Sequence, residues 1–93
     1  MFAIAFDLIV AEAEKRHPQG ISQAYLDIRN CLKKFGFDWV QGSLYVTPND
    51  DLANLFKALL ALKGMSWFPL SVRDIRGFKV EHWSDFTSIV KDS

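Results

Sequence analysis

The chain contains the stretch Phe2-Ala3-Ile4-Ala5-Phe6-Asp7-Leu8-Ile9-Val10, which is apolar except for one acid. Residues two apart in a strand point to the same face, so the bulky side chains at 2, 4, 6, 8 and 10 form one face and the smaller ones flank Asp7 on the other. Both faces are therefore expected to be covered. Because an unpaired buried carboxylate is costly, Asp7 either reaches solvent at the strand end, has a partner, or performs chemistry.

The composition is that of an ordinary globular domain. The 93 residues are 49% apolar and have a formal net charge of zero, so binding to nucleic acid must depend on a local patch. We expect one domain over residues 1–93. The apolar runs are too short to span a membrane and no signal peptide is apparent, so we expect a cytoplasmic protein with no membrane partner. Cys31, His17 and His82 are too few for a disulfide or a thiolate zinc site.

The apolar periodicity predicts the remaining elements. Apolar residues recur at helical spacing over 21–35, and Gly36 with Phe37 after it is typical of a Schellman-type cap. Thr47 is expected to cap a second helix that ends at Gly64. The other expected elements are a strand at 2–10, a connecting loop with one helical turn at 11–20, short strands at 37–40 and 43–47, a strand at 72–83 with a bulge near Arg76-Gly77, and a terminal helix capped by Ser84.

This order predicts an α+β fold of the ferredoxin-like type, β-α-β-β-α-β with a short C-terminal helix. In that arrangement both long helices cover one face of a four-stranded antiparallel sheet. The other face would be bare, and Ala3, Ala5 and Ile9 on that side need cover, which a second copy can supply. We therefore expect a homodimer. A two-fold axis would bring Asp7 toward its mate, and two close carboxylates either share a proton or bind a cation.

Three motifs in the chain support a family resemblance. They are Phe2-Ala3-Ile4-Ala5-Phe6-Asp7-Leu8, Gln41-Gly42-Ser43-Leu44-Tyr45-Val46 and Ser71-Val72-Arg73-Asp74-Ile75-Arg76-Gly77-Phe78-Lys79-Val80, followed by Trp83-Ser84-Asp85-Phe86-Thr87. In this order they resemble the bacterial virulence-associated protein D family over essentially the whole chain. The resemblance implies a homodimeric endoribonuclease that cleaves single-stranded RNA. It also implies a role as the toxin of a toxin–antitoxin pair, with a small antitoxin protein as its partner.

The same family is similar to a small CRISPR-associated nuclease, and that likeness implies roles for individual residues. Asp7 matches the catalytic Asp at the end of the first strand. Gln41 and Ser43 match a motif of the middle strands, which implies that Gln41 contacts the substrate. Gly77 stands where the family has Ala.

Cleavage of a phosphodiester needs a base, a means to offset the phosphate charge and a proton for the leaving oxygen. Asp7 with its mate can act as a metal-free base or hold Mg²⁺ or Mn²⁺, whereas no organic cofactor is expected. Arg73 and Arg76 can offset phosphate charge, and Ser43 can hydrogen-bond a phosphate oxygen. The usual strand order of this fold places Asp74 on the strand beside that of Asp7, where it is either a second catalytic acid or the salt-bridge partner of a neighbouring Arg.

Two other classes of function remain open at this point. One is a non-catalytic adaptor dimer that binds nucleic acid or protein with a dispensable Asp7. The other is a small-ligand sensor, and the only support for it is that ferredoxin-like domains often pair to bind metabolites. Trp39 or Trp67 at a sheet end is a further candidate, for stacking a base.

Overall fold

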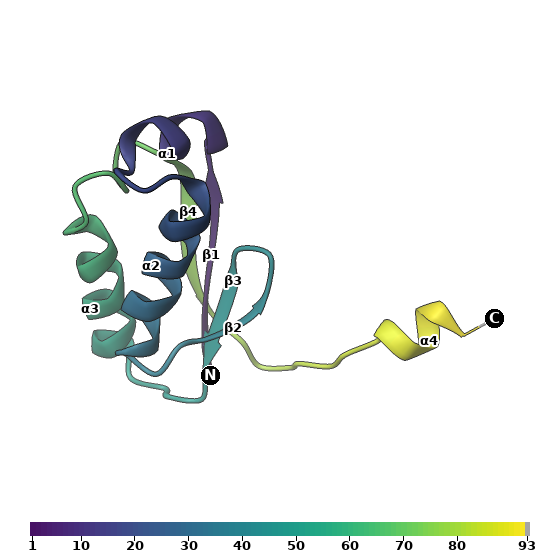
Figure 1. The fold of residues 1–93 in the computed structure, drawn as a ribbon. Coiled ribbons are helices and arrows are strands. Elements are labelled where there is room, and N and C mark those ends of the chain that lie inside the picture. The colour runs from purple at the N-terminus through teal and green to yellow at the C-terminus, as the bar shows by residue number, and fades with distance from the viewer. Residues whose placement is uncertain (93) are drawn as a thin grey trace.

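A computed structural model describes residues 1–92 of the chain. Four strands and two long helices form its main body, and two shorter helices complete it (Figure 1). The elements are β1 (Phe2–Leu8), α1 (Val10–Arg16), α2 (Ile21–Lys33), β2 (Asp38–Gln41), β3 (Leu44–Thr47), α3 (Leu52–Lys63), β4 (Val72–Lys79) and α4 (Thr87–Lys91). Among the described residues, no helix is long and apolar enough to cross a membrane.

The sheet confirms the predicted fold class. Its strands lie in the order β2-β3-β1-β4 and every neighbouring pair is antiparallel. The helices α2 and α3 pack on one face of the sheet and leave the other face open (Figure 1). The arrangement is therefore α+β and ferredoxin-like, with α1 inserted between β1 and α2.

The alternation of β1 builds the core. Phe2, Ile4, Phe6 and Leu8 are all buried beneath the helices, as period two requires. They pack against the buried stripes of α2 and α3, which comprise Ala24, Ile28 and Leu32 on one helix and Leu55, Ala58 and Leu62 on the other. On the open face Ala3 is buried, Ala5 is partly buried and Asp7 is exposed. Exposure on that face thus increases toward the end of the strand.

The segment predicted as a connecting loop is a two-turn helix instead. Residues 10–16 contain good helix formers, and Arg16 bonds the Glu12 carboxylate one turn earlier. Ala13 on its inner side is fully buried. The next residue, His17, accepts the Gln19 amide at Nδ1, so its Nε2–H donates to Asp27 at 2.6 Å. This contact ties the end of α1 to α2.

The boundaries that we predicted for the two long helices had different outcomes, and Gly64 does end α3. Gly36 has φ of +79°, and Phe37 N–H donates to the Leu32 carbonyl, which confirms the Schellman-type cap of α2. In contrast, Thr47 does not cap α3. Thr47 pairs with Phe2 and stays in β3, whereas Asp51 caps the helix by accepting the Ala53 amide.

The last strand ends earlier than predicted, at Lys79 instead of residue 83. Lys79 pairs with Phe2, where β1 begins, and the Val80 amide makes one further bond, to the Met1 carbonyl at 2.8 Å, before the chain turns away. The bulge also lies elsewhere. The register shifts between Asp7 and Leu8, opposite Arg73, and the pairing is regular past Gly77. The chain then leaves the sheet, and α4 stands apart from the main body with Phe86, not Ser84, at its N-cap (Figure 1).

Candidate active site

Two acids face each other where β1 and β4 stop pairing regularly. Asp7 and Asp74 are direct partners across the two strands, the last pair before the register shift. Side chains of directly opposed residues lie on the same face with Cβ atoms about 4.5–5.5 Å apart. Both carboxylates therefore project from the face that the helices leave open. The prediction that Asp74 lies on the strand beside Asp7 is confirmed.

The bulge brings a guanidinium to this pair. Because Leu8 pairs with Val72, Arg73 is the extra residue of β4, and its Nη1 lies 3.6 Å from Asp7 Oδ2. Arg76, two residues from Asp74 on the same face, places Nε 3.0 Å from Asp74 Oδ2. Each acid thus has one arginine. Arg76 donates a hydrogen bond to Asp74, whereas Arg73 is too far from Asp7 for a good hydrogen bond and forms only an ion pair.

The cluster is open to solvent. The side chains of Asp7 and Asp74 are 62% and 52% exposed, and those of Arg73 and Arg76 are 64% and 75% exposed. The acids border a shallow hollow of about 200 Å³ whose floor includes Ala5. Exposed ion pairs contribute only about 0–1 kcal/mol to stability, so either arginine can leave its carboxylate for a ligand at little cost.

The donor atoms of the cluster suit a hard divalent cation. Mg²⁺ is typically held by one or two carboxylates, with waters and substrate phosphate oxygens as the other ligands. Asp7 and Asp74 supply that number within one chain. No group of three or more acidic, His or Cys side chains is placed to hold a metal within residues 1–92. A cation at this position would therefore depend on substrate, water or a second chain for its remaining ligands.

The structure does not bring the other two predicted residues to the acids. Leu44 pairs with Ala5 and shares its face, so Ser43, one residue earlier, points to the helix side of the sheet. Its backbone is close to β1 all the same, because the Phe6 amide donates to the Ser43 carbonyl at 3.2 Å. Gln41 is on the edge strand β2, two strand spacings or about 10 Å from β1.

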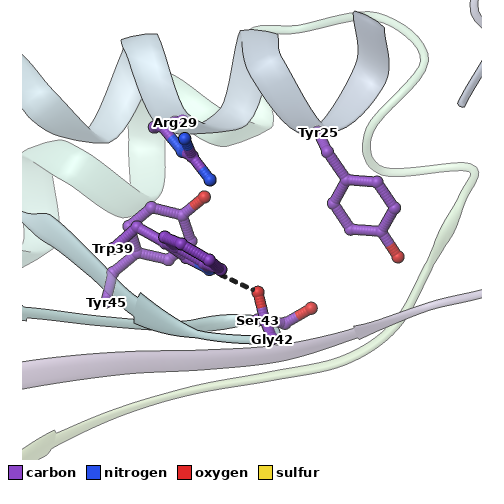
Figure 2. Close-up of a pocket in the computed structure, with 6 residues that line it drawn as sticks. All are labelled: Tyr25, Arg29, Trp39, Gly42, Ser43 and Tyr45. Atoms are coloured by element: carbon purple, nitrogen blue, oxygen red, sulfur yellow. Dashed lines mark hydrogen bonds between the residues drawn. The ribbon is translucent and has the colours of Figure 1, made fainter. Parts of the chain in front are cut away.

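Ser43 instead lines a second hollow that the sequence did not reveal (Figure 2). Its walls are Tyr25, Arg29, Trp39, Gly42, Ser43 and Tyr45. Their spacing predicts core positions for both tyrosines, and Tyr45 is indeed buried, whereas Tyr25 is only partly buried. The usable signal was the four-residue spacing of Tyr25 and Arg29, which places both on the same side of α2.

Known proteins resemble this chain over its full length. No protein-family model matches it. A Neisseria gonorrhoeae protein named "Endoribonuclease VapD homolog" is 62% identical over 91 residues, covering 98% of this chain and 99% of that protein. A Haemophilus influenzae protein named "Endoribonuclease VapD" is 53% identical, and the match covers 99% of this chain and 100% of that protein. A Dichelobacter nodosus protein of the same name is 52% identical, and the match covers 98% of this chain and 98% of that protein.

Proposed function

The chain belongs to the VapD family of endoribonucleases, and we propose that it cleaves single-stranded RNA at the hollow beside Asp7 and Asp74. The observation that supports this site is the direct pairing of the two acids, each with one arginine, on an exposed sheet face. Paired carboxylates can accept a proton and arginines can offset the charge on a phosphate, and phosphodiester cleavage needs both. An open hollow also admits a polymer, which an enclosed pocket would not.

The proposed mechanism assigns Asp7 as the general base. Asp7 is held by a 3.6 Å ion pair, whereas Asp74 is engaged in a 3.0 Å hydrogen bond, so Asp7 is the freer acceptor for the proton of an attacking hydroxyl. The guanidiniums of Arg73 and Arg76 turn from the carboxylates to the phosphate and offset the charge that develops on its oxygens. Asp74 holds Arg76 in position before substrate arrives, and water at this exposed cluster supplies the proton that the leaving oxygen takes up.

We further propose that Asp7 and Asp74 hold Mg²⁺ or Mn²⁺ when substrate is bound. Such a cation would polarise the phosphate and lower the pKa of a bound water. The two arginines would then remain on the phosphate oxygens instead of returning to the acids.

Replacing Asp7 by Asn should reduce RNA cleavage by at least about a hundredfold, the usual scale for loss of a general base or metal ligand. The free energy of unfolding should change by less than about 1 kcal/mol, because the side chain is mostly exposed and its ion pair is weak. The cleavage rate is measured with a labelled RNA, and the free energy of unfolding is measured by urea denaturation. Asp38→Asn, the same change on an exposed β2 residue, is the matched control. An Asp7→Asn protein that unfolds early yet still cleaves RNA would show a structural role.

Removing divalent cations should abolish cleavage, and adding Mg²⁺ or Mn²⁺ should restore it, since carboxylate and phosphate oxygens suit those ions. The rate of cleavage is measured in excess chelator and again after each cation is added back. Cleavage that persists in chelator would assign proton transfer to Asp7 alone, with attack by the RNA 2′-hydroxyl.

We propose a homodimer formed through the open sheet face. The support is the apolar character of that face, where Ala5 and Leu44 are only partly covered and Phe78 is 45% exposed. A second copy would cover these residues and, by two-fold symmetry, add its own acids close to those of the first. Asp7 lies at the end of this face, so the second copy would flank the hollow and leave it accessible to RNA.

Ala5→Lys should therefore shift the protein toward monomer and reduce RNA cleavage, because a charge would be placed on the covered face. Ala11→Lys, the same change on exposed α1, should do neither. Sedimentation velocity at micromolar concentration measures the fraction of dimer, and the labelled-RNA assay measures the cleavage rate. A dimer that survives Ala5→Lys would place the contact elsewhere.

We also propose that the enzyme is a cytoplasmic toxin controlled by a small antitoxin protein, which family resemblance supports. Expression of the protein alone should slow bacterial growth, and Asp7→Asn should relieve the effect because RNA would no longer be degraded. Growth curves with matched protein levels measure this. Growth arrest by Asp7→Asn at full strength would favour a non-catalytic adaptor instead.

A further inference from the structure

The hollow on the helix side of the sheet has walls from three elements. It occupies about 260 Å³ where the β2–β3 hairpin passes beneath α2. Figure 2 shows Tyr25 on one side and Arg29, Trp39 and Tyr45 on the other, with Ser43 between them. One of its lining residues lies next to the end of β1, because the Ser43 carbonyl accepts the amide of Phe6, the residue before Asp7.

Arg29 is held in place without a carboxylate. Its guanidinium carbon lies 4.3 Å from the centre of the Trp39 ring, a cation–π contact. The Trp39 indole N–H in turn donates to the Gly42 carbonyl at 2.8 Å, which orients the ring (Figure 2). Within residues 1–92, no carboxylate lies within salt-bridge distance of Arg29. Its charge is therefore positioned but not neutralised.

The other walls offer a ring and hydroxyl groups. Burial raises the pKa of the Tyr45 phenol, which therefore stays neutral at physiological pH. Its oxygen can accept a hydrogen bond from the Arg29 guanidinium. Tyr25 is partly buried and presents its ring across the gap from Ser43 (Figure 2). The volume of about 260 Å³ is just below the range of about 300–1,000 Å³ typical of sites for drug-sized ligands, so the hollow has room for no more than one nucleotide.

We propose that this hollow binds one nucleotide of the RNA substrate, with its base stacked on Tyr25 and its phosphate at Arg29. A base stacks on an aromatic ring and a phosphate pairs with a guanidinium, and both groups are present within one small hollow. The Ser43 hydroxyl would hydrogen-bond the edge of the base or the ribose. Ser43 then positions substrate and does not act at the scissile phosphate, in agreement with its side of the sheet.

The proposal rests on the proposed function, because it assigns a substrate subsite to that nuclease. A strand that leaves the hollow past Ser43 reaches the end of β1, where Asp7 lies on the opposite face. Trp, Tyr and Arg are also common in protein interfaces, so a protein partner is the competing occupant. The hydroxyls around the hollow, and the backbone bond that joins Ser43 to the end of β1, favour RNA.

Binding is tested in the Asp7→Asn background, where substrate is not consumed. Fluorescence anisotropy with a labelled single-stranded oligoribonucleotide gives the Kd. Tyr25→Ala should raise the Kd about 5- to 150-fold, the range expected for loss of one stacked base. Tyr25→Phe, which keeps the ring and guards against misfolding, should bind nearly as well as the parent. Arg29→Gln should weaken binding, and Lys34→Gln, the same loss of charge elsewhere, should weaken it less.

In the protein with Asp7 intact, Tyr25→Ala should raise KM more than it lowers kcat, unlike the loss of a catalytic group. Unchanged Kd and KM in both Tyr25→Ala and Arg29→Gln, with RNA still cleaved, would overturn the subsite and leave the nuclease standing. If RNA binding depends on Tyr25 but the protein with Asp7 intact cleaves no RNA, the subsite stands and the proposed nuclease function is overturned. Loss of antitoxin binding without loss of RNA binding would assign the hollow to a protein partner.

Discussion

The structure depends on the register of β1. This strand is hydrogen-bonded on both sides, to β3 and to β4, and its bulky residues are buried under the helices. A slip of one residue would turn Phe6 and Leu8 to solvent and bury Asp7, which is costly in both respects. The core therefore holds Asp7 on the open face, and every residue that is paired with β1 takes its position from the same register.

The acid cluster arises where this pairing becomes irregular. The shift between Asp7 and Leu8 adds Arg73 to β4 opposite the end of β1, so a cation is placed beside an acid by backbone geometry. Bulges commonly redirect side chains next to functional sites. Here the regular pairs before the bulge align Asp7 with Asp74, and the extra residue supplies the counter-charge. The cluster is exposed because the strands end there, which suits a polymeric substrate.

The two hollows divide the proposed work between the two faces of the sheet. The acids lie on the open face, whereas Arg29 and the aromatic rings lie on the helix side. The β2–β3 hairpin joins them, since the Ser43 backbone pairs with β1 while its side chain points to α2. In this arrangement the hairpin would separate the proposed positioning of substrate from the proposed phosphate chemistry.

Local patterns in the sequence were sufficient for much of the fold. The alternation around Asp7, the helical spacing over 21–35 and the glycine at 36 each concern residues near one another in the chain, so propensity and burial determine them together. The ferredoxin-like order followed from these elements. It placed Asp74 beside Asp7, because that topology sets β1 next to β4.

Features that depend on pairing between distant segments were decided only by the tertiary structure. Lys79 ends β4 because Phe2 begins β1, and Thr47 remains in a strand because Phe2 holds it there. The bulge at Arg73, like the face on which Ser43 lies, follows from registers that no local window contains. The sequence by itself indicated both acids as candidates and the order of the elements apart from α1. Only tertiary structure decided that Arg73 meets Asp7 and that Tyr25 and Ser43 line one hollow, because those residues come from separate segments of the chain.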